Sequence, residues 1–153
     1  MAHRVPAPVD PERLGAVLAP SLAEGRTLPP EAYVSPEVFA WEEEHLFGGT
    51  WVCLGRSEAL ARPGDQAAFR VGRDGVLVVR GEDGALRGFF NACRHRGHEL
   101  LACGEARNLR VLRCPYHAWT YGLDGRLLGA PRFADVPGFD RSSYPLIPAR
   151  VAE

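Results

Sequence analysis

The sequence predicts an all-β-dominated fold: an antiparallel β sandwich with binding loops at one end, preceded by one or two short N-terminal helices. From about residue 50 onward, short runs of β-branched and aromatic residues alternate with turn signals built from Asp, Gly and Pro. Ahead of residue 50, apolar residues instead recur at helical spacing behind Asp-Pro and Ser-Pro starts. The 153 residues suit one domain with a buried core.

The first predicted helix covers residues 11–23. It opens with Asp10-Pro11-Glu12, which places Pro at the first helical position and an acid in the first turn. Apolar residues follow at near-helical spacing, and Gly25 is expected to end the helix.

A second helix is predicted to begin after Ser35, which can cap it, with Pro36 at its first position. Gly48-Gly49 would end it. The expected organisation is a leader with a short helix over 1–34, a helix over 35–49 and a β domain over 50–150.

The β domain is expected to contain short strands separated by tight turns. The predicted strands are 51–54, 66–71, 76–80, 86–90, 109–113, 118–121 and 126–128. Asp74-Gly75, Asp83-Gly84 and Asp124-Gly125 mark the predicted hairpins, because Asp-Gly pairs favour the positive φ of two-residue turns.

Two segments of this domain each combine one cysteine with one histidine. They read Cys93-Arg94-His95 and, after eighteen further residues, Cys114-Pro115-Tyr116-His117. A Rieske 2Fe–2S cluster has two unlike irons, one bound by two thiolates and the other by two imidazoles. Two loops that approach such a cluster from opposite sides would each supply one Cys and one His. We refer to residues 93–98 as the first clip and to 114–119 as the second clip.

Two other chemistries use the same residue types. Structural zinc accepts two Cys and two His in a tetrahedron, although zinc sites usually pair Cys with Cys and His with His. C-x-H is an awkward zinc clip, so a zinc-stabilised binding module is the less favoured reading. A disulfide is a further reading, but the composition suggests a reducing compartment.

The residues around the clips resemble the Rieske domain of ring-hydroxylating oxygenase large (alpha) subunits. The similar stretches are Asn91–His98, Cys114–Tyr121 and Leu123–Leu127, with a leader-like stretch over 28–51, so that the resemblance covers about residues 28–150. It implies one Rieske 2Fe–2S cluster per chain. Cys93 and Cys114 would bind one iron, and His95 and His117 the other.

The resemblance also implies a function, which is one-electron transfer as the electron-delivery domain of an oxidoreductase of the ring-hydroxylating dioxygenase or monooxygenase type. An NAD(P)H-dependent reductase or a ferredoxin would be the donor, and an oxygenase catalytic domain the acceptor. A stand-alone Rieske ferredoxin is the alternative, although such proteins are usually shorter and lack the 28–51 leader.

Catalysis in those oxygenases needs a mononuclear Fe(II) held by two histidines and a carboxylate. Apart from the clip histidines, the chain has only His3, His45 and His98, which give no facial triad of recognisable spacing. We therefore expect no mononuclear iron site and no catalytic residue in this chain.

Respiratory Rieske proteins differ from this sequence at defined places. They carry an extra cysteine in each clip, and the two form a disulfide; here those places hold His98 and Tyr116. Their serine donor to a bridging sulfide is replaced by Trp119, whereas Tyr121 matches a tyrosine that can donate to a cluster sulfur. The loss of one donor predicts a potential at the low end of the Rieske range of roughly −150 to +300 mV.

Other residues near the ligands are expected to have supporting roles. Gly97 should let the first clip turn tightly, and Pro115 should stiffen the second. Arg94 and Arg96 would present positive charge to a partner or offset the cluster charge. Cys53 and Cys103 are interpreted as bystanders rather than ligands. The residues expected to surround the cluster without binding iron are Arg96, Gly97, Tyr116, Trp119 and Tyr121.

Composition argues against several partners. The net charge of −1 gives no sign of a nucleic-acid partner or of an anionic membrane surface. No apolar run approaches the roughly 18 residues of a membrane helix. Met1–Pro6 lacks the apolar stretch of a secretory signal. We therefore expect a cytoplasmic protein that binds neither nucleic acid nor membrane.

Overall fold

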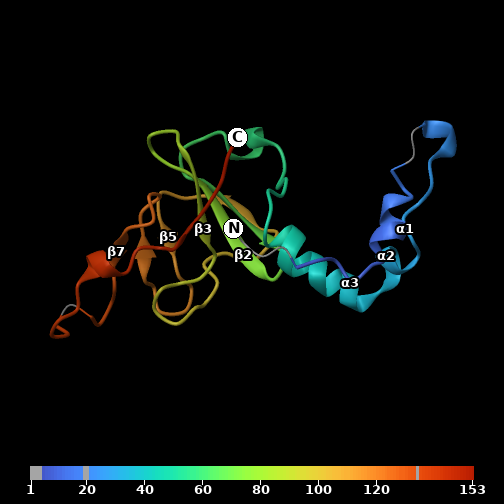
Figure 1. The fold of residues 1–153 in the computed structure, drawn as a ribbon. Helices are drawn as coiled ribbons and strands as arrows, with labels where there is room; N and C mark the ends of the chain where they lie inside the picture. Colours follow the sequence, from blue (N-terminus) through green and yellow to red (C-terminus); the bar gives the residue numbers. More distant parts are fainter. Residues whose placement is uncertain (1–4, 19–20, 134) are drawn as a thin grey trace. The chain divides into compact units, whose positions relative to one another are not determined.

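The computed structural model describes residues 5–18, 21–133 and 135–153. The chain divides into two compact units, Met1–Val52 and Cys53–Glu153 (Figure 1). The first unit is helical and the second is built from β strands. Among the described residues, no helix combines the length and apolarity needed to cross a membrane.

The first unit contains short helices. They are α1 (Pro11–Gly15), the 3-10 turn η1 (Leu22–Glu24), α2 (Glu31–Val34), α3 (Pro36–Trp41) and the π-helical η2 (Glu42–Phe47). The predicted helix over 11–23 is wrong in length, because α1 ends at Gly15; residues 19 and 20 lie outside the described part of the chain. Glycine lowers helix propensity at that point. The predicted start is present: Pro11 opens the helix, and Asp10 caps it by accepting a hydrogen bond from the Glu12 N–H.

The second predicted helix agrees more closely with the structure. Ser35 caps α3, its hydroxyl accepting from the Val38 N–H at 3.4 Å. The helix continues into η2, where the last turn widens, and the Gly48 N–H donates to the Glu43 carbonyl five residues back. Helical structure stops at Gly48, as the Gly-Gly pair predicts. The turn α2 ahead of Ser35 was not predicted.

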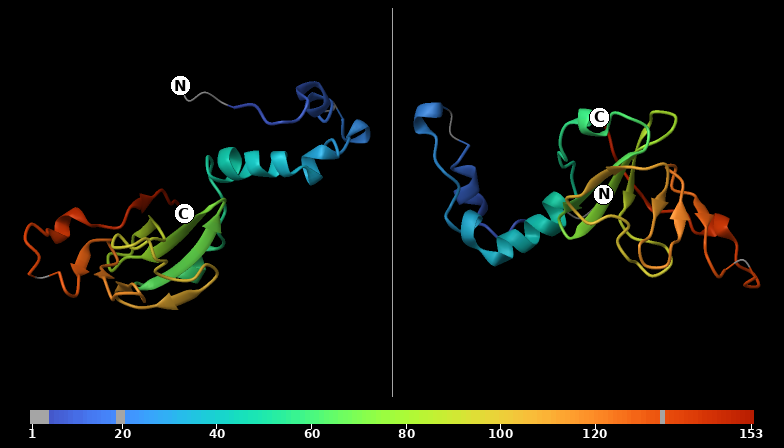
Figure 2. Two further views of the ribbon diagram at one scale, coloured as in Figure 1. Left: turned by 90° about the horizontal axis from the view of Figure 1, so that it is seen from below. Right: turned by 180° about the vertical axis from the view of Figure 1, so that it is seen from behind.

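The second unit consists of two antiparallel sheets, which confirms the predicted fold class (Figure 2). The five-stranded sheet has the order β4 (Ala106–Asn108), β1 (Asp65–Val71), β2 (Asp74–Arg80), β3 (Leu86–Phe90), β8 (Pro148–Ala149). The three-stranded sheet has the order β5 (Leu112–Arg113), β6 (Thr120–Tyr121), β7 (Leu127–Gly129). Two 3-10 turns, η3 (Ser57–Leu60) and η4 (Arg141–Ser143), complete it.

The β1–β2 hairpin turns two residues earlier than predicted. Val71 pairs with Asp74, so the turn is made by Gly72 and Arg73, and Asp74-Gly75 belongs to β2. Gly72 supplies the positive φ of +55° that such a turn needs. The other two predicted Asp-Gly turns are present, with φ of +78° at Gly84 and +83° at Gly125.

Two strand predictions were wrong or incomplete, and two strands were missed. Residues 51–54 form no strand, and the predicted strand over 109–113 is limited to β5. The strands β4 and β8 were not predicted, because Ala-Arg-Asn and Pro-Ala have low strand propensity. Each pairs with a strand distant in sequence: β4 with β1, and β8 with β3.

The core of the β domain draws on both sheets and reaches the clips. Its fully buried members include Leu77, Val79, Leu100, Leu112, Trp119 and Tyr121. The same cluster contains Cys93 and Cys114, each 3% exposed. Both cysteines therefore belong to the core, and their packing in it fixes the positions of the two clips.

Candidate metal centre

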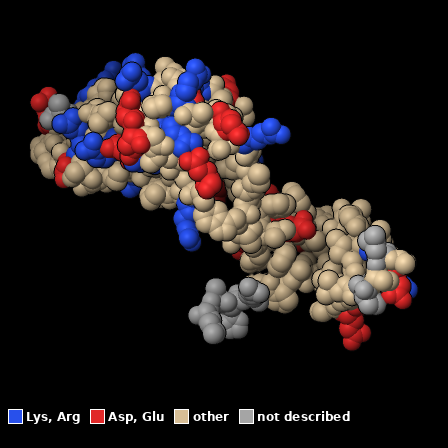
Figure 3. Space-filling view, turned by 90° about the horizontal axis from the view of Figure 1, so that it is seen from above, with Lys and Arg blue, Asp and Glu red and all other residues tan. Residues whose placement is uncertain are grey.

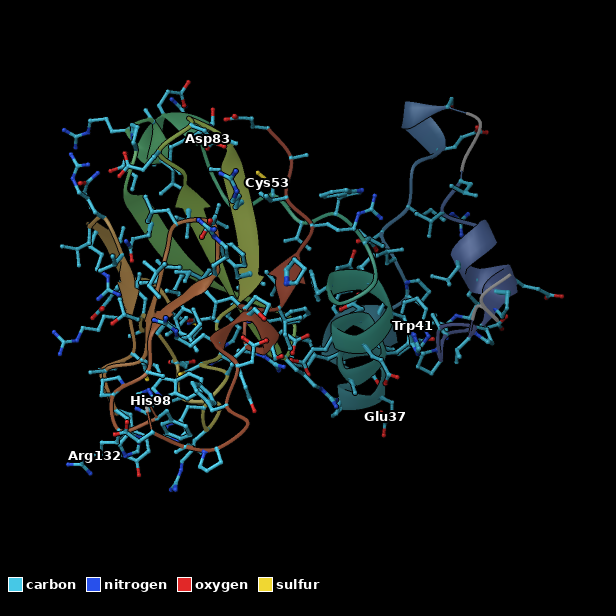
Figure 4. All side chains as sticks on the ribbon, turned by 90° about the vertical axis from the view of Figure 1, so that its left-hand side faces the viewer. Glu37, Trp41, Cys53, Asp83, His98 and Arg132 are labelled. Carbon is cyan, nitrogen blue, oxygen red and sulfur yellow. The ribbon has the colours of Figure 1, made fainter. Side chains whose placement is uncertain are left out.

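The two clips are carried by different sheets. The first clip follows β3 of the five-stranded sheet, and the second clip connects β5 to β6 of the three-stranded sheet. Figure 4 labels His98 at the end of the β domain opposite to Asp83, which lies in the β2–β3 turn. The clips are thus loops at one end of the β domain, and paired strands hold them there.

The first clip is closed by hydrogen bonds to its cysteine. The Cys93 N–H donates to the His98 carbonyl at 2.9 Å, and the Gly97 N–H donates to the Cys93 carbonyl at 2.8 Å. Gly97 has a φ of +70°, a left-handed conformation that glycine adopts without strain. This confirms that Gly97 allows the tight turn.

The second clip repeats the same pattern. The Cys114 N–H donates to the Trp119 carbonyl at 2.8 Å, and the Ala118 N–H donates to the Cys114 carbonyl at 3.1 Å. Ala118 has a φ of +57°, although it is not glycine. Such a conformation costs on the order of 1–3 kcal/mol and persists only where the surroundings impose it. The two Cys/His pairs are therefore carried by two turns that have the same pattern of backbone hydrogen bonds.

The four predicted ligands form two pairs by chemistry. The Cys93 and Cys114 thiols are buried and interact with each other. The half-buried rings of His95 and His117 have centroids 4.9 Å apart at 68°. Among the described residues no group of three or more His, Cys, Asp and Glu side chains is arranged to hold a single ion. A Rieske cluster takes only two protein ligands on each iron.

One buried atom marks a place for a ligand bond. Nδ1 of His117 is buried and has no hydrogen-bond partner within the described part of the chain. A buried polar atom without a partner is costly, and a metal ion would occupy its lone pair. Burial, followed by the charges of His117 and Arg96, lowers the pKa of His95 and favours the neutral imidazole that binds metals. The residues present fit a Rieske cluster.

Tyr121 connects the core to the first clip. Its hydroxyl lies 3.2 Å from Sγ of Cys93 and accepts a hydrogen bond from the Arg94 N–H at 3.0 Å. Burial, together with the Cys93 contact, raises the pKa of Tyr121 above its usual range, so the phenol keeps its proton. Burial also raises the pKa of the Cys93 thiol, while Tyr121 and the His95 N–H oppose that rise. Tyr121 can therefore donate to the Cys93 sulfur.

Tyr121→Phe is expected to lower the midpoint potential of a loaded chain by about 60 mV. That shift corresponds to about 1.4 kcal/mol in a one-electron couple, the size of one hydrogen bond to a charged group. A donor to sulfur stabilises the reduced, more negative cluster, so its removal favours oxidation. A redox titration followed by visible absorption measures the change. Tyr144→Phe, whose ring stacks on Phe139, is the control and should leave the potential unchanged; an equal potential in both variants would contradict the role of Tyr121.

Trp119 supports His95 from the core. Its ring stacks on His95 with centroids 5.0 Å apart at 9°, and it is 1% exposed. Three further aromatic rings pack edge-on against it: Phe133, Phe139 and Tyr144. Sequence reasoning placed Trp119 near the ligands and noted the lost hydrogen-bond donor, but it missed these three rings. Their clustering within the segment 133–144 was the available signal.

Asn91 closes the base of the first clip and was also missed as a functional residue. Its side-chain oxygen accepts from the N–H groups of Leu100 and Leu101 at 3.1 and 3.3 Å. Its amide donates to the Leu101 carbonyl at 2.6 Å. A buried asparagine with three bonds to the far end of a loop holds both ends of that loop together. Its buried position, which only the tertiary structure shows, is what reveals the role.

The chain is similar to several known proteins. The family model described as the Rieske [2Fe-2S] domain matches residues 50–140. The carnitine monooxygenase oxygenase subunit of Acinetobacter baumannii is 42% identical over 128 residues, which are 83% of this chain and 34% of that protein. The chlorobenzene dioxygenase subunit alpha of a Cupriavidus species is 37% identical over 129 residues, which are 84% of this chain and 28% of that protein.

Solved structures agree with these matches. The apo form of the quaternary ammonium Rieske monooxygenase CntA has a TM-score of 0.74 and 38% identity, over 84% of this chain and 37% of that one. Naphthalene 1,2-dioxygenase from a Rhodococcus species has a TM-score of 0.72 and 37% identity, over 80% of this chain and 28% of that one. The chain spans about a third of the length of the curated carnitine monooxygenase subunits that it matches.

Proposed function

The chain belongs to the Rieske [2Fe-2S] domain family, and we propose that it transfers single electrons as the electron-delivery domain of an oxygenase. The observation that carries the proposal is the site itself: two buried cysteines and two histidines, presented by matching turns on two different sheets. The similarity to oxygenase subunits supports the choice of acceptor.

We assign Cys93 and Cys114 to one iron and His95 and His117 to the other. When bound, a Rieske cluster supplies a centre that accepts and releases one electron. The protein's part is to keep the ligands fixed, and here paired strands and a shared core hold both turns. Fixed ligands lower the cost of reorganisation when the charge changes.

The two kinds of ligand differ in exposure, and this defines a route for the electron. The cysteines are 3% exposed, whereas His95 and His117 are partly exposed at the clips. Burial keeps water from the thiolates, and Tyr121 supplies a hydrogen bond to one of them. The histidine side of the site is therefore the side that a redox partner can approach.

Charge near the clips suggests the kind of donor. Arg94 and Arg96 of the first clip are exposed, and so is Arg113, directly ahead of Cys114. Elsewhere on the β domain, the face shown in Figure 3 carries basic and acidic side chains interspersed. We propose that the electron donor is a reductase or a ferredoxin with an acidic face, because complementary charges speed association. We also propose that the chain works in the reducing cytoplasm.

Spectroscopy on the purified chain tests the proposal. We expect a red-brown colour when oxidised and, after reduction with dithionite, the EPR signal with a low average g value that marks a Rieske centre. The reduced chain should then pass electrons to a separately expressed oxygenase catalytic domain, monitored by the return of the oxidised absorption. A colourless protein that contains only zinc would overturn the assignment of function.

A further inference from the structure

Two aromatic side chains outside the proposed ligand set connect the clips. His98 is the last residue of the first clip, and Tyr116 lies in the second clip beside His117. The centroids of the His98 and Tyr116 rings are 5.6 Å apart, with the rings tilted by 36°. This distance is within the range of aromatic contacts. The contact joins two loops that belong to different sheets.

Each ring is oriented by its own loop. The His98 carbonyl accepts from the Cys93 N–H at 2.9 Å, and Nδ1 of His98 lies 2.7 Å from the Glu99 carbonyl. The Tyr116 ring lies against His117, with centroids 3.7 Å apart at 37°. The rings of His98, Tyr116 and His117 therefore follow one another from the first clip to a proposed iron ligand.

The core does not hold Tyr116 in this place. Its side chain is 55% exposed, whereas Trp119 in the same clip is 1% exposed. Its ring contacts the rings of His98 and His117. An exposed ring can be removed without opening a cavity in the core, so its effect on the site can be separated from an effect on folding.

We propose that the His98–Tyr116 contact is a non-covalent clasp that keeps the two clips at the spacing the cluster requires. Both are positioning residues: Tyr116 covers one face of His117, and His98 holds the Tyr116 ring in place. The inference rests on the proposed function, because it concerns how a cluster ligand is held.

Double-mutant analysis of cluster loss tests the clasp. Tyr116→Ala and His98→Ala should each speed the decay of the visible absorption under a chelator by about 3- to 10-fold, the range expected for a lost ring contact. The double variant should decay no faster than the faster single variant, because both changes break one contact. Tyr116→Phe, which keeps the ring, should stay within about 2-fold of the unmodified chain. Tyr33→Ala, another exposed tyrosine, is the matched control.

EPR spectra of the same reduced variants give a second readout. Without the ring against it, His117 can adopt more orientations, so Tyr116→Ala and His98→Ala should broaden the signal. Tyr116→Phe and Tyr33→Ala should leave it unchanged. A residue with only a general effect on folding would not produce this split between alanine and phenylalanine.

The outcomes separate the two proposals. If the unmodified chain shows no Rieske signal, the proposed function fails and the clasp fails with it. If the unmodified chain shows the signal but Tyr116→Ala decays and resonates like it, only the clasp is overturned. Single effects that multiply in the double variant would also overturn the clasp, since they would show that the two rings act independently.

Discussion

Replacing Cys114 by serine is expected to leave the purified chain colourless and without a Rieske EPR signal. The ligand form of cysteine is the thiolate, and a serine hydroxyl does not ionise at neutral pH. Cys114 is 3% exposed and lies in the β5–β6 turn, where its N–H and carbonyl are both hydrogen-bonded within the turn. Iron analysis and visible absorption measure the loss directly.

The same substitution should also lower stability. Binding to the native state alone stabilises a protein, by about 4 kcal/mol for a ligand present at 1,000 times its dissociation constant. Chemical unfolding of Cys114→Ser and of the loaded chain should show a difference of that order. The assignment predicts that Cys93→Ser loses as much colour and stability as Cys114→Ser, because both thiols are buried in the same hydrophobic core.

Cys103→Ser is the matched control for the ligand assignment. Cys103 is half-buried in the segment between the clips, and its Sγ lies 3.5 Å from the Phe69 carbonyl. A serine can keep that hydrogen bond, so the cluster should be retained in full. Loss of colour in Cys103→Ser together with its retention in Cys114→Ser would show that the ligands were assigned wrongly.

Trp119→Ala is expected to destabilise the β domain by about 3–5 kcal/mol, the usual cost of truncating a buried aromatic residue to alanine. Trp119 is 1% exposed and contacts His95 and three other aromatic rings. The cavity would remove the surface on which His95 stacks, so we also expect a broadened EPR signal. Urea unfolding of the loaded chain measures the change in the free energy of unfolding.

Trp119→Phe separates the ring from its N–H group. Nε1 of Trp119 is buried and has no hydrogen-bond partner among the described residues, so removing it breaks no hydrogen bond there. We expect phenylalanine to recover most of the stability and the stacking on His95. Phe39→Ala, at a side chain that is 57% exposed, should cost under about 0.5 kcal/mol. A Trp119→Ala variant as stable as Phe39→Ala would contradict the role given to Trp119.

The fold class followed from local signals, and the two missed strands share one cause. Asp83-Gly84 and Asp124-Gly125 were predicted as turns because a positive φ is a property of the turn residues themselves. β4 and β8 could not be predicted in the same way. Ala-Arg-Asn becomes a strand because β1 offers it partners about forty residues away in the sequence.

The site shows the same division. Ligand type follows from side-chain chemistry, and so two Cys/His clips and the positive φ at Gly97 were readable from the residues in order. The stacking of Trp119 on His95, the reach of Tyr121 to Cys93 and the Asn91 bonds were not. The first two contacts join segments carried by different sheets, and the Asn91 bonds join the two ends of one loop.

The sequence by itself determined which ligands this protein can offer to a cluster: two thiolates and two imidazoles, in mixed clips, on a β domain with an oxygenase-type leader. Only the tertiary structure decided how these donors are held. It buried both cysteines, left Nδ1 of His117 without a partner and brought Tyr116 against His98. The reason is physical: donor chemistry belongs to single residues, whereas burial and ring contacts arise only when distant segments pack together.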